Sequence, residues 1–195
     1  MHTFRPCKLL INMSVIFHKL KDHLVNPKTK ILILGTFTPD LPDGPDFFYG
    51  RERNFLWHLL PVCWGLPDLK TASLAEKLSF MEAHNIDFAD FILSLSIPEG
   101  EELHVDDAFV DSHVNEWRDI GSLINVLSNL EAVYFTRKTF NGIPNIRTQL
   151  NLITELCKQR NIRLCKLETP AKFFSPEKQQ QWIDTIVRQK TCLKP

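Results

Sequence analysis

The residues best suited to chemistry lie in one segment, GTFTPDLPDGPDFFYGRERNFLW, at positions 35–57. Gly35 permits a ligand to approach the backbone closely, because it has no side chain. Three consecutive aromatic residues, Phe47, Phe48 and Tyr49, offer rings on which a planar ligand could stack. The same rings could instead belong to the hydrophobic core, where aromatic residues are commonly found.

Three polar residues near the end of this segment could hold a ligand. Arg51 and Arg53 carry the side chain that pairs best with phosphate, and Asn54 presents both an acceptor and a donor. Each also has a structural explanation, since the arginines flank Glu52 as on a solvated surface and asparagine is a favoured helix N-cap. The order of these residues, more than any one of them, indicates a functional loop, because loops of this length in compact domains commonly carry function.

The elements that must position this segment follow from the apolar pattern. The run Ile31–Leu34 predicts a buried central strand, and a helix is expected to begin near Asn54. Further strands are predicted at 88–97, 132–136 and 162–167. Further helices are predicted at 14–25, 73–84, 106–129 and 143–157, with a last one opened by Ser175 as N-cap and Pro176 as its first residue.

Strands separated by helices pair in parallel through right-handed crossovers. We therefore predict an α/β fold, a three-layer αβα sandwich around a central, mainly parallel four-stranded sheet. Ligands bind at the carboxyl ends of the strands in such folds. The segments 35–54, 98–106, 136–142 and 168–175 should therefore converge, and the second of them carries His104.

Composition narrows the class of partner. The chain has 195 residues and a formal net charge of zero, with 23 basic and 23 acidic residues. A strongly steering nucleic-acid binder is usually basic overall, so tight non-specific binding to DNA is not expected. Any contact with DNA must use local patches and must depend on salt.

Cysteine and histidine usage gives no sign of a metal. The five cysteines show no Cys-x-x-Cys spacing, and the seven histidines form no HExxH or His-x-His group. We therefore expect reduced thiols, a cytoplasmic protein, and neither a metal nor another cofactor. No apolar run approaches the about 20 residues that span a bilayer. Residues 1–12 are expected to be a disordered extension and 13–195 a single domain.

The order of residues in 31–57 resembles the uracil-DNA glycosylase superfamily, most closely its hypoxanthine-DNA glycosylase-like branch. That branch has a strand running into Gly-Ser-Phe, a loop, and then Tyr-Tyr-Gly-x-x-x-Asn-x-x-Trp. This chain has ILILGTF at 31–37, FYG at 48–50 and RERNFLW at 51–57. A weaker resemblance covers about 30–188, including HNIDFADFILS at 84–94 and LETPAKFFSPEKQQQW at 167–182.

The resemblance implies a role for each matching residue. Asn54 corresponds to the catalytic asparagine of the branch, whereas Phe37 stands where the wider superfamily has a catalytic Asp or Asn. The residues implied at the base are Gly35, Thr36, Phe37, Phe48 and Tyr49, with Phe48 or Tyr49 stacking on it. The residues expected at DNA phosphates are Arg51, Arg53, Arg137, Lys138, Thr169 and Lys172.

The implied activity is that of a monofunctional, monomeric DNA glycosylase. Such an enzyme acts on DNA with a damaged or deaminated base (hypoxanthine, xanthine or uracil), flips the base out and attacks its N-glycosidic bond with water. Two alternatives stay open: a catalytically silent relative that binds nucleic acid or another partner through the same cleft, and a hydrolase of nucleosides or other small ligands. The late segment Glu168–Lys172, which departs from the Pro-Ser-rich loop of the branch, favours the first alternative.

Overall fold

The computed structural model describes residues 12–104 and 106–188. From the N-terminus, its elements are β1 (Met13–Phe17), β2 (Ile31–Gly35), α1 (Leu56–Val62), α2 (Leu74–His84), β3 (Ile86–Asp90), β4 (Ile92–Pro98), α3 (Asp107–Ser112), β5 (Val114–Trp117), α4 (Ile120–Val126), β6 (Ala132–Phe135), α5 (Pro144–Gln159), β7 (Arg163–Lys166) and α6 (Pro176–Ile186). The predicted α/β class is confirmed.

The central sheet has four parallel strands in the order β3-β2-β6-β7. Side chains alternate between the two faces of a strand, so a strand covered on both faces must be apolar throughout. In β2, Leu32 and Leu34 join one hydrophobic cluster and Ile33 joins the other. The apolar run that predicted this strand is therefore explained by burial on both faces.

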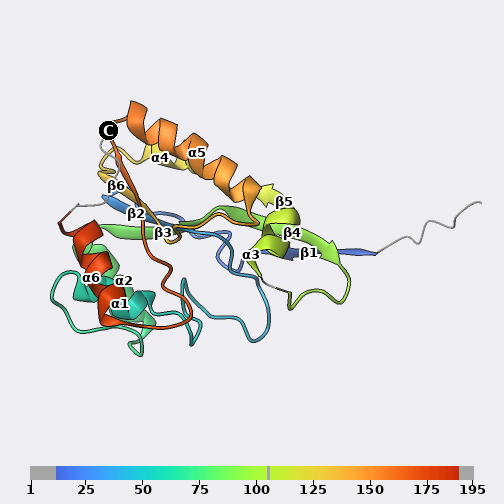
Figure 1. Ribbon diagram of the computed structural model, residues 1–195, viewed down its shortest axis with the longest axis horizontal. Coiled ribbons are helices and arrows are strands. Elements are labelled where there is room, and N and C mark those ends of the chain that lie inside the picture. Colours follow the sequence, from blue (N-terminus) through green and yellow to red (C-terminus); the bar gives the residue numbers. More distant parts are fainter. Residues whose placement is uncertain (1–11, 105, 189–195) are drawn as a thin grey trace, which may run out of the picture.

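Helices cover the two faces of the sheet, as Figure 1 shows, and complete the three predicted layers. The face that carries Leu32 and Leu34 packs against α4 and α5. The opposite face packs against α1, α2 and α6, with Trp57 and Trp182 fully buried between them. Ser175 accepts a hydrogen bond from the Lys178 N–H, so the predicted start of the last helix is confirmed.

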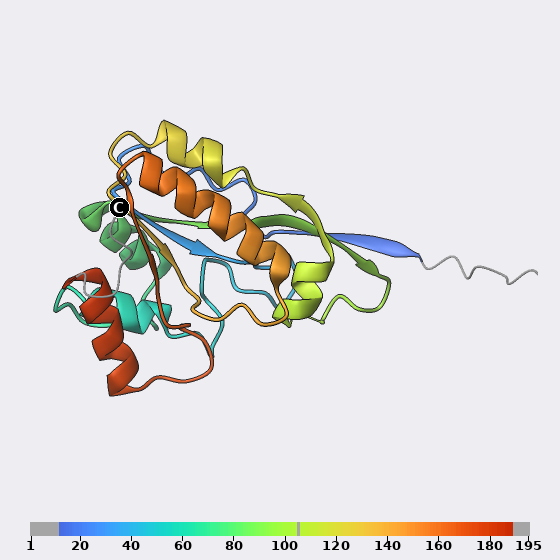
Figure 2. The same ribbon diagram turned by 45° about the horizontal axis from the view of Figure 1, so that its top comes forward.

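A second sheet was not predicted. It has three antiparallel strands in the order β1-β4-β5, and in Figures 1 and 2 it extends beyond one end of the central sheet. The predicted strand 88–97 is in fact two strands, because the chain leaves the central sheet after Asp90 and enters the second sheet at Ile92. Asp90 therefore stands at the carboxyl end of β3.

The predicted helix 14–25 is wrong. Residues 13–17 pair with β4, and the apolar face expected for a helix is not buried as one face: Ile16 is in the core, but Val15 is 49% and Leu24 88% exposed. β-Branched and aromatic residues favour a strand when a partner is present, and the partner here lies about 80 residues further along the chain. A local pattern cannot reveal such a distant pairing.

The predicted helix 106–129 is also wrong as one element. Asp106 caps α3 and Asp119 caps α4, each with its own side chain. The residues between these helices form β5, which pairs with β4. The two capping aspartates were the sequence signal for two separate helix starts.

Three further expectations concern the ends, the cysteines and the surface. The expected extension 1–12 lies, apart from Asn12, outside the described residues. Cys63 and Cys157 are buried free thiols, but Cys165 is disulfide-bonded, so the expectation of reduced thiols is wrong there. The spacing of the cysteines in the sequence does not predict this bond, because disulfide partners need only meet in space.

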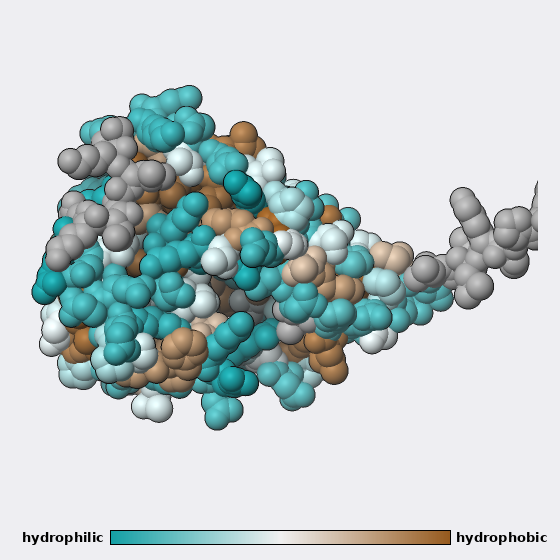
Figure 3. Space-filling model, in the orientation of Figure 1, coloured by the Kyte–Doolittle hydropathy of each residue, from teal (hydrophilic) through white to brown (hydrophobic). Residues whose placement is uncertain are grey.

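Among the described residues no helix is long and apolar enough to cross a membrane, and the face of the molecule in Figure 3 is mostly hydrophilic.

Candidate functional site

A pocket of about 380 Å³ lies at the carboxyl edge of the central sheet, within the usual size range for ligand sites. Gly35 reaches it from β2, Asp90 from β3, Thr136 follows β6, and residues 168–172 follow β7. Three of the four segments predicted to converge therefore do so. The fourth, 98–106, contributes no described residue to the lining, because β4 carries the chain into the second sheet.

Gly35 forms the floor of this pocket and has no space for a side chain. A Cβ at residue 35 would overlap Oδ1 of Asp90 and would lie 2.7 Å from the hydroxyl oxygen of Tyr49. The absence of a side chain thus lets a carboxylate and a phenol converge above the end of β2. This is a close approach that only glycine permits.

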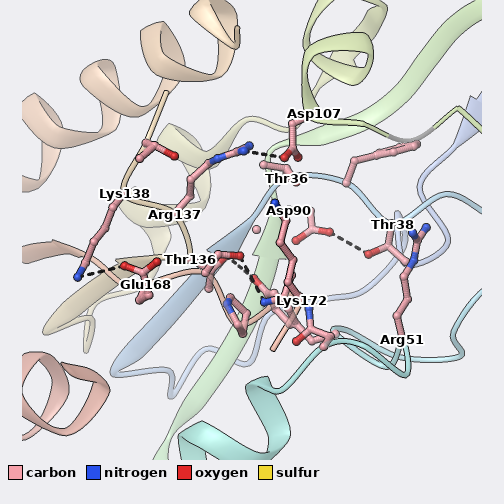
Figure 4. A pocket seen from close by; sticks show the side chains of 18 of the residues that line it. Thr36, Thr38, Arg51, Asp90, Asp107, Thr136, Arg137, Lys138, Glu168 and Lys172 are labelled. Carbon is pink, nitrogen blue, oxygen red and sulfur yellow. Dashed lines mark hydrogen bonds and ion pairs between the residues drawn. The ribbon is translucent and has the colours of Figure 1, made fainter. Parts of the chain in front are cut away.

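Asp90 is the most buried charged group of the site, with 4% of its surface exposed. Its Oδ2 accepts hydrogen bonds from Nε2 of His18 at 2.7 Å and from Oγ1 of Thr38 at 3.3 Å. Figure 4 shows Asp90 and Thr38 joined in this way beside Thr36. A buried carboxylate needs such partners, because removing its charge from water is costly.

Tyr49 lies on the same floor. Its backbone has a φ of 55°, and its hydroxyl is 3.1 Å from Oγ1 of Thr136. Burial raises the pKa of Tyr49 well above its ordinary value, and the negative charge of Asp90 raises it further, whereas the hydrogen bond with Thr136 lowers it. The phenol therefore keeps its proton at neutral pH.

Phe48 does not have the predicted position. It is 1% exposed, stacks on Phe88 with ring centroids 5.5 Å apart, and is absent from the pocket lining. The next residue, Tyr49, does line the pocket, because its positive φ turns it away from Phe48. The aromatic side chains at the pocket are consequently Tyr49 and Phe37.

Asn54 is partly exposed and lines the pocket, at the start of α1. Its Oδ1 accepts a hydrogen bond from the Leu56 N–H at 3.0 Å, which closes a turn just before the helix. The N-cap of α1 is Phe55, so the expected N-cap role of Asn54 is wrong by one residue. The backbone of Asn54 forms a bridge with Ala171, and Phe55 N–H donates to the Pro170 carbonyl at 2.8 Å. The late segment 168–172 is thereby attached to the residue with the predicted catalytic role.

The predicted phosphate-binding residues fall into two groups. Arg137 pairs with Asp107 at 2.6 Å and Lys138 with Glu168 at 3.5 Å, and Figure 4 shows both pairs at the pocket. Arg51 and Lys172 also line the pocket, and neither forms an ion pair within the described part of the chain. Thr169 lines it as well, with its Oγ1 accepting from the Ala171 N–H, whereas exposed Arg53 lies outside the lining.

Sequence reasoning missed Asp90, His18, Thr38 and Thr136. His18 and Asp90 are 72 residues apart, and no spacing motif joins them. The available signal was the position of Asp90 next to the end of a buried strand, which the prediction of one long strand concealed. His104, which had been expected near the site, instead pairs with Glu101 and Asp106. In the described part of the chain no group of three or more His, Cys, Asp or Glu residues could hold a metal ion.

The fold and the pocket define an α/β protein with a polar ligand site at the carboxyl edge of a parallel sheet. A solved structure with a similar fold is that of a candidate uracil DNA glycosylase from Methanosarcina acetivorans, determined by NMR in solution. The TM-score is 0.58 at 18% identity, over 85% of this chain and 92% of that chain. At this identity the likeness shows a shared fold. No family model matches the chain, and no curated protein is significantly similar to it in sequence.

Proposed function

We propose that this protein is a DNA glycosylase that removes a deaminated base, namely hypoxanthine, xanthine or uracil, by flipping the base and hydrolysing its N-glycosidic bond. The observation that carries the proposal is the meeting of Gly35, Tyr49 and Asn54 in one pocket. The fold shared with a candidate uracil DNA glycosylase and the resemblance of residues 31–57 to the hypoxanthine-DNA glycosylase-like branch support it.

The reaction needs few groups. As the bond between C1′ and the base breaks, positive charge develops on the sugar and negative charge on the base. Fixed donors aimed at the base stabilise the second charge, and a positioned water completes the reaction at C1′. The water adds to the sugar, and its proton leaves with the base or with solvent. No covalent nucleophile is required, so the expected product is an intact strand with an abasic site.

Asn54 is suited to hold that water. The Leu56 N–H occupies one acceptor position of Oδ1 and thereby fixes the plane of the amide. A carbonyl oxygen has a second acceptor position, which stays available for a water hydrogen. The bridge to Ala171 further restricts the backbone of Asn54.

The remaining requirement is that the pocket binds the flipped base strongly enough to offset the cost of unstacking it. This cost is a few kcal/mol and is smallest for mispaired bases. Stacking on the ring of Phe37 contributes about 1–3 kcal/mol per base, while Tyr49 presents its hydroxyl at the pocket floor. Arg51 and Lys172 are the cations best placed to meet phosphates at the pocket, since Arg137 and Lys138 have acidic partners. Binding should therefore be modest and dependent on salt.

The test is an excision assay with duplexes that carry a single hypoxanthine, xanthine or uracil, followed by alkali to cut abasic sites. We expect cutting of at least one duplex, and a loss of about 100-fold or more in Asn54→Ala. Asn54→Ser keeps a short acceptor for the Leu56 N–H and should lose activity equally, which separates catalysis from the local hydrogen bond to Leu56. Asn125→Ala, an exposed residue on α4, is the matched control and should retain full activity.

The second candidate function is that of a catalytically silent protein that binds nucleic acid or another partner through the same cleft. The two ion pairs that neutralise Arg137 and Lys138 favour this candidate. Its signature is retained binding of the duplexes with no cutting of any of them. That result would exclude the glycosylase.

A further inference from the structure

The orientation of Asp90 is fixed by its partners. The Leu20 N–H donates to Nδ1 of His18 at 2.9 Å, so the neutral ring carries its proton on Nε2. Nε2 donates this proton to Oδ2 of Asp90, with the two atoms 2.7 Å apart, and Oγ1 of Thr38 donates to the same oxygen. One oxygen of the carboxylate is thus satisfied by two donors from the protein.

The other oxygen faces the pocket. Oδ1 of Asp90 lies against Gly35, close enough to exclude a Cβ there, and no described residue donates a hydrogen bond to it. A carboxylate oxygen is an acceptor only, and Oδ1 of Asp90 is not among the buried side-chain atoms that lack a hydrogen-bond partner, so it is open to the pocket. The pocket therefore presents an acceptor that a ligand N–H would satisfy.

A hydroxyl stands beside this acceptor. The hydroxyl oxygen of Tyr49 lies 2.7 Å from the position that a Cβ at residue 35 would take. It shares a hydrogen bond with Oγ1 of Thr136, in which either oxygen can donate. Oγ1 of Thr136 has a single proton, which it also directs to the Leu34 carbonyl oxygen at 3.3 Å, an oxygen that already accepts from the Thr136 N–H. When the Thr136 proton turns to Tyr49 instead, the Tyr49 proton becomes available to a ligand. Burial together with the charge of Asp90 raises the pKa of Tyr49 and keeps that proton in place.

We infer that Asp90 and Tyr49 recognise the lactam edge of the flipped base, that is, its ring N–H and the adjacent carbonyl oxygen. Asp90 accepts a hydrogen bond from the ring N–H, and Tyr49 donates one to the carbonyl oxygen. The inference rests on the proposed function and names the substrate class of that pocket. Hypoxanthine, xanthine and uracil all have an unsubstituted lactam. Adenine and cytosine, held by the sugar in the same orientation, place an acceptor nitrogen against Asp90 and an amino group against Tyr49. Guanine and thymine share the lactam, so this pair does not exclude them.

The first experiment compares duplexes with hypoxanthine and with 1-methylhypoxanthine opposite the same base. The methyl group removes the N–H, so we expect excision at least tenfold slower. Adenine in the same mispair should be excised more slowly still. Equal rates for hypoxanthine and either of the other two bases would overturn the inference while leaving the glycosylase intact.

The second experiment uses Asp90→Asn. His18 and Thr38 donate to one side of this group, so the amide oxygen should take that side and the NH2 should face the pocket. A donor then meets the N–H of hypoxanthine, and we expect its excision to fall about 10- to 100-fold, with little preference left over 1-methylhypoxanthine. Asp87→Asn is the matched control, because Asp87 is also buried in β3, pairs with His23 and does not line the pocket. An unchanged preference in Asp90→Asn would contradict the inference.

A third measurement keeps the two proposals separate. If no base is excised, the glycosylase fails, and free hypoxanthine and 1-methylhypoxanthine are then titrated against the protein by NMR. If the protein binds hypoxanthine more tightly than 1-methylhypoxanthine, and Asp90→Asn abolishes this difference, the result would support lactam recognition by Asp90 in a protein that does not cleave the base. Equal binding of the two bases, or no binding of either, would overturn it.

Discussion

At the scale of single residues, the pocket depends most on a missing side chain. Gly35→Ala adds a Cβ that overlaps Oδ1 of Asp90 and crowds Tyr49. We expect a loss of about 1–3 kcal/mol in the free energy of unfolding, as for other overpacked sites, and loss of base excision. Thermal unfolding by circular dichroism and the excision assay measure the two effects.

Gly121→Ala is the control for this change. Gly121 lies in α4, and the nearest atom to an added Cβ is 3.4 Å away. Alanine in a helix should be neutral or stabilise by about 0.5–1 kcal/mol. Normal excision by Gly35→Ala would show that Asp90 and Tyr49 do not meet above residue 35.

The sequence predicted part of this site. Gly35, Thr36, Phe37, Tyr49 and Asn54 do line one pocket, because their order along a single loop is visible in one dimension. His18 and Asp90 could not be paired in advance, since only the antiparallel pairing of β1 with β4 brings His18 to the end of β3. Phe48 shows the same limit: which of three consecutive rings enters the core depends on one positive φ.

At the scale of elements, α6 holds the late segment against α1. Lys178 in α6 is buried, and its ammonium group donates to the carbonyls of Ala171 and Phe173 at 3.2 and 2.6 Å. Burial lowers the pKa of Lys178, and the charge of Glu168 opposes that shift. Because Ala171 is bridged to Asn54, the helix positions the amide indirectly.

Lys178→Met should therefore reduce excision by about tenfold and lower the free energy of unfolding by about 1–3 kcal/mol, since two partly buried carbonyls lose a charged donor. The rate should be measured well below the melting temperature, so that the effect on Asn54 is separated from unfolding. Lys158→Met removes an exposed lysine of α5 whose one acidic partner among the described residues is Glu155, and it should change neither quantity. Full activity of Lys178→Met would mean that the late segment keeps its place without α6.

The elements themselves were predictable where burial is local. The two central strands β2 and β6 are continuous apolar runs, and α5 and α6 have a clear apolar face and a proline at the first turn. β1 and β5 were missed because an exposed edge strand has no strong pattern of its own and is decided by its partner. The second sheet is thus a product of long-range pairing.

At the scale of the whole molecule, buried phenols and thiols predict sensitivity to alkali. Burial raises the pKa of Cys63 to about 12 and that of Cys157 to about 11, from 9.0 in the unfolded chain. Burial also raises the pKa values of Tyr49 and Tyr134 above 10.0, and these are the only two tyrosines in the sequence. The folded protein therefore binds more protons than the unfolded chain at high pH.

The sign follows from this difference. Stability from these four groups is complete below pH 9 and is lost as the pH rises through 9 to 12, by up to about 1.4 kcal/mol per pH unit for each group. We expect melting temperatures, measured by circular dichroism, to be level from pH 7 to 9 and to fall above it. Tyr49→Phe should make the fall above pH 10 less steep. A melting temperature that stays constant to pH 11 would contradict the burial of these groups.

The pocket can form only after most of the chain has been synthesised. His18 comes from the first strand and turn, Asp90 from the middle of the chain, and Lys172 from the segment before the last helix. During synthesis, the site therefore stays incomplete until the segment that contains Lys172 has left the ribosome. A growing or truncated chain that lacks one of these residues has an incomplete site. Fragments that begin beyond residue 18 or stop before residue 172 should be inert, however well their own strands and helices form.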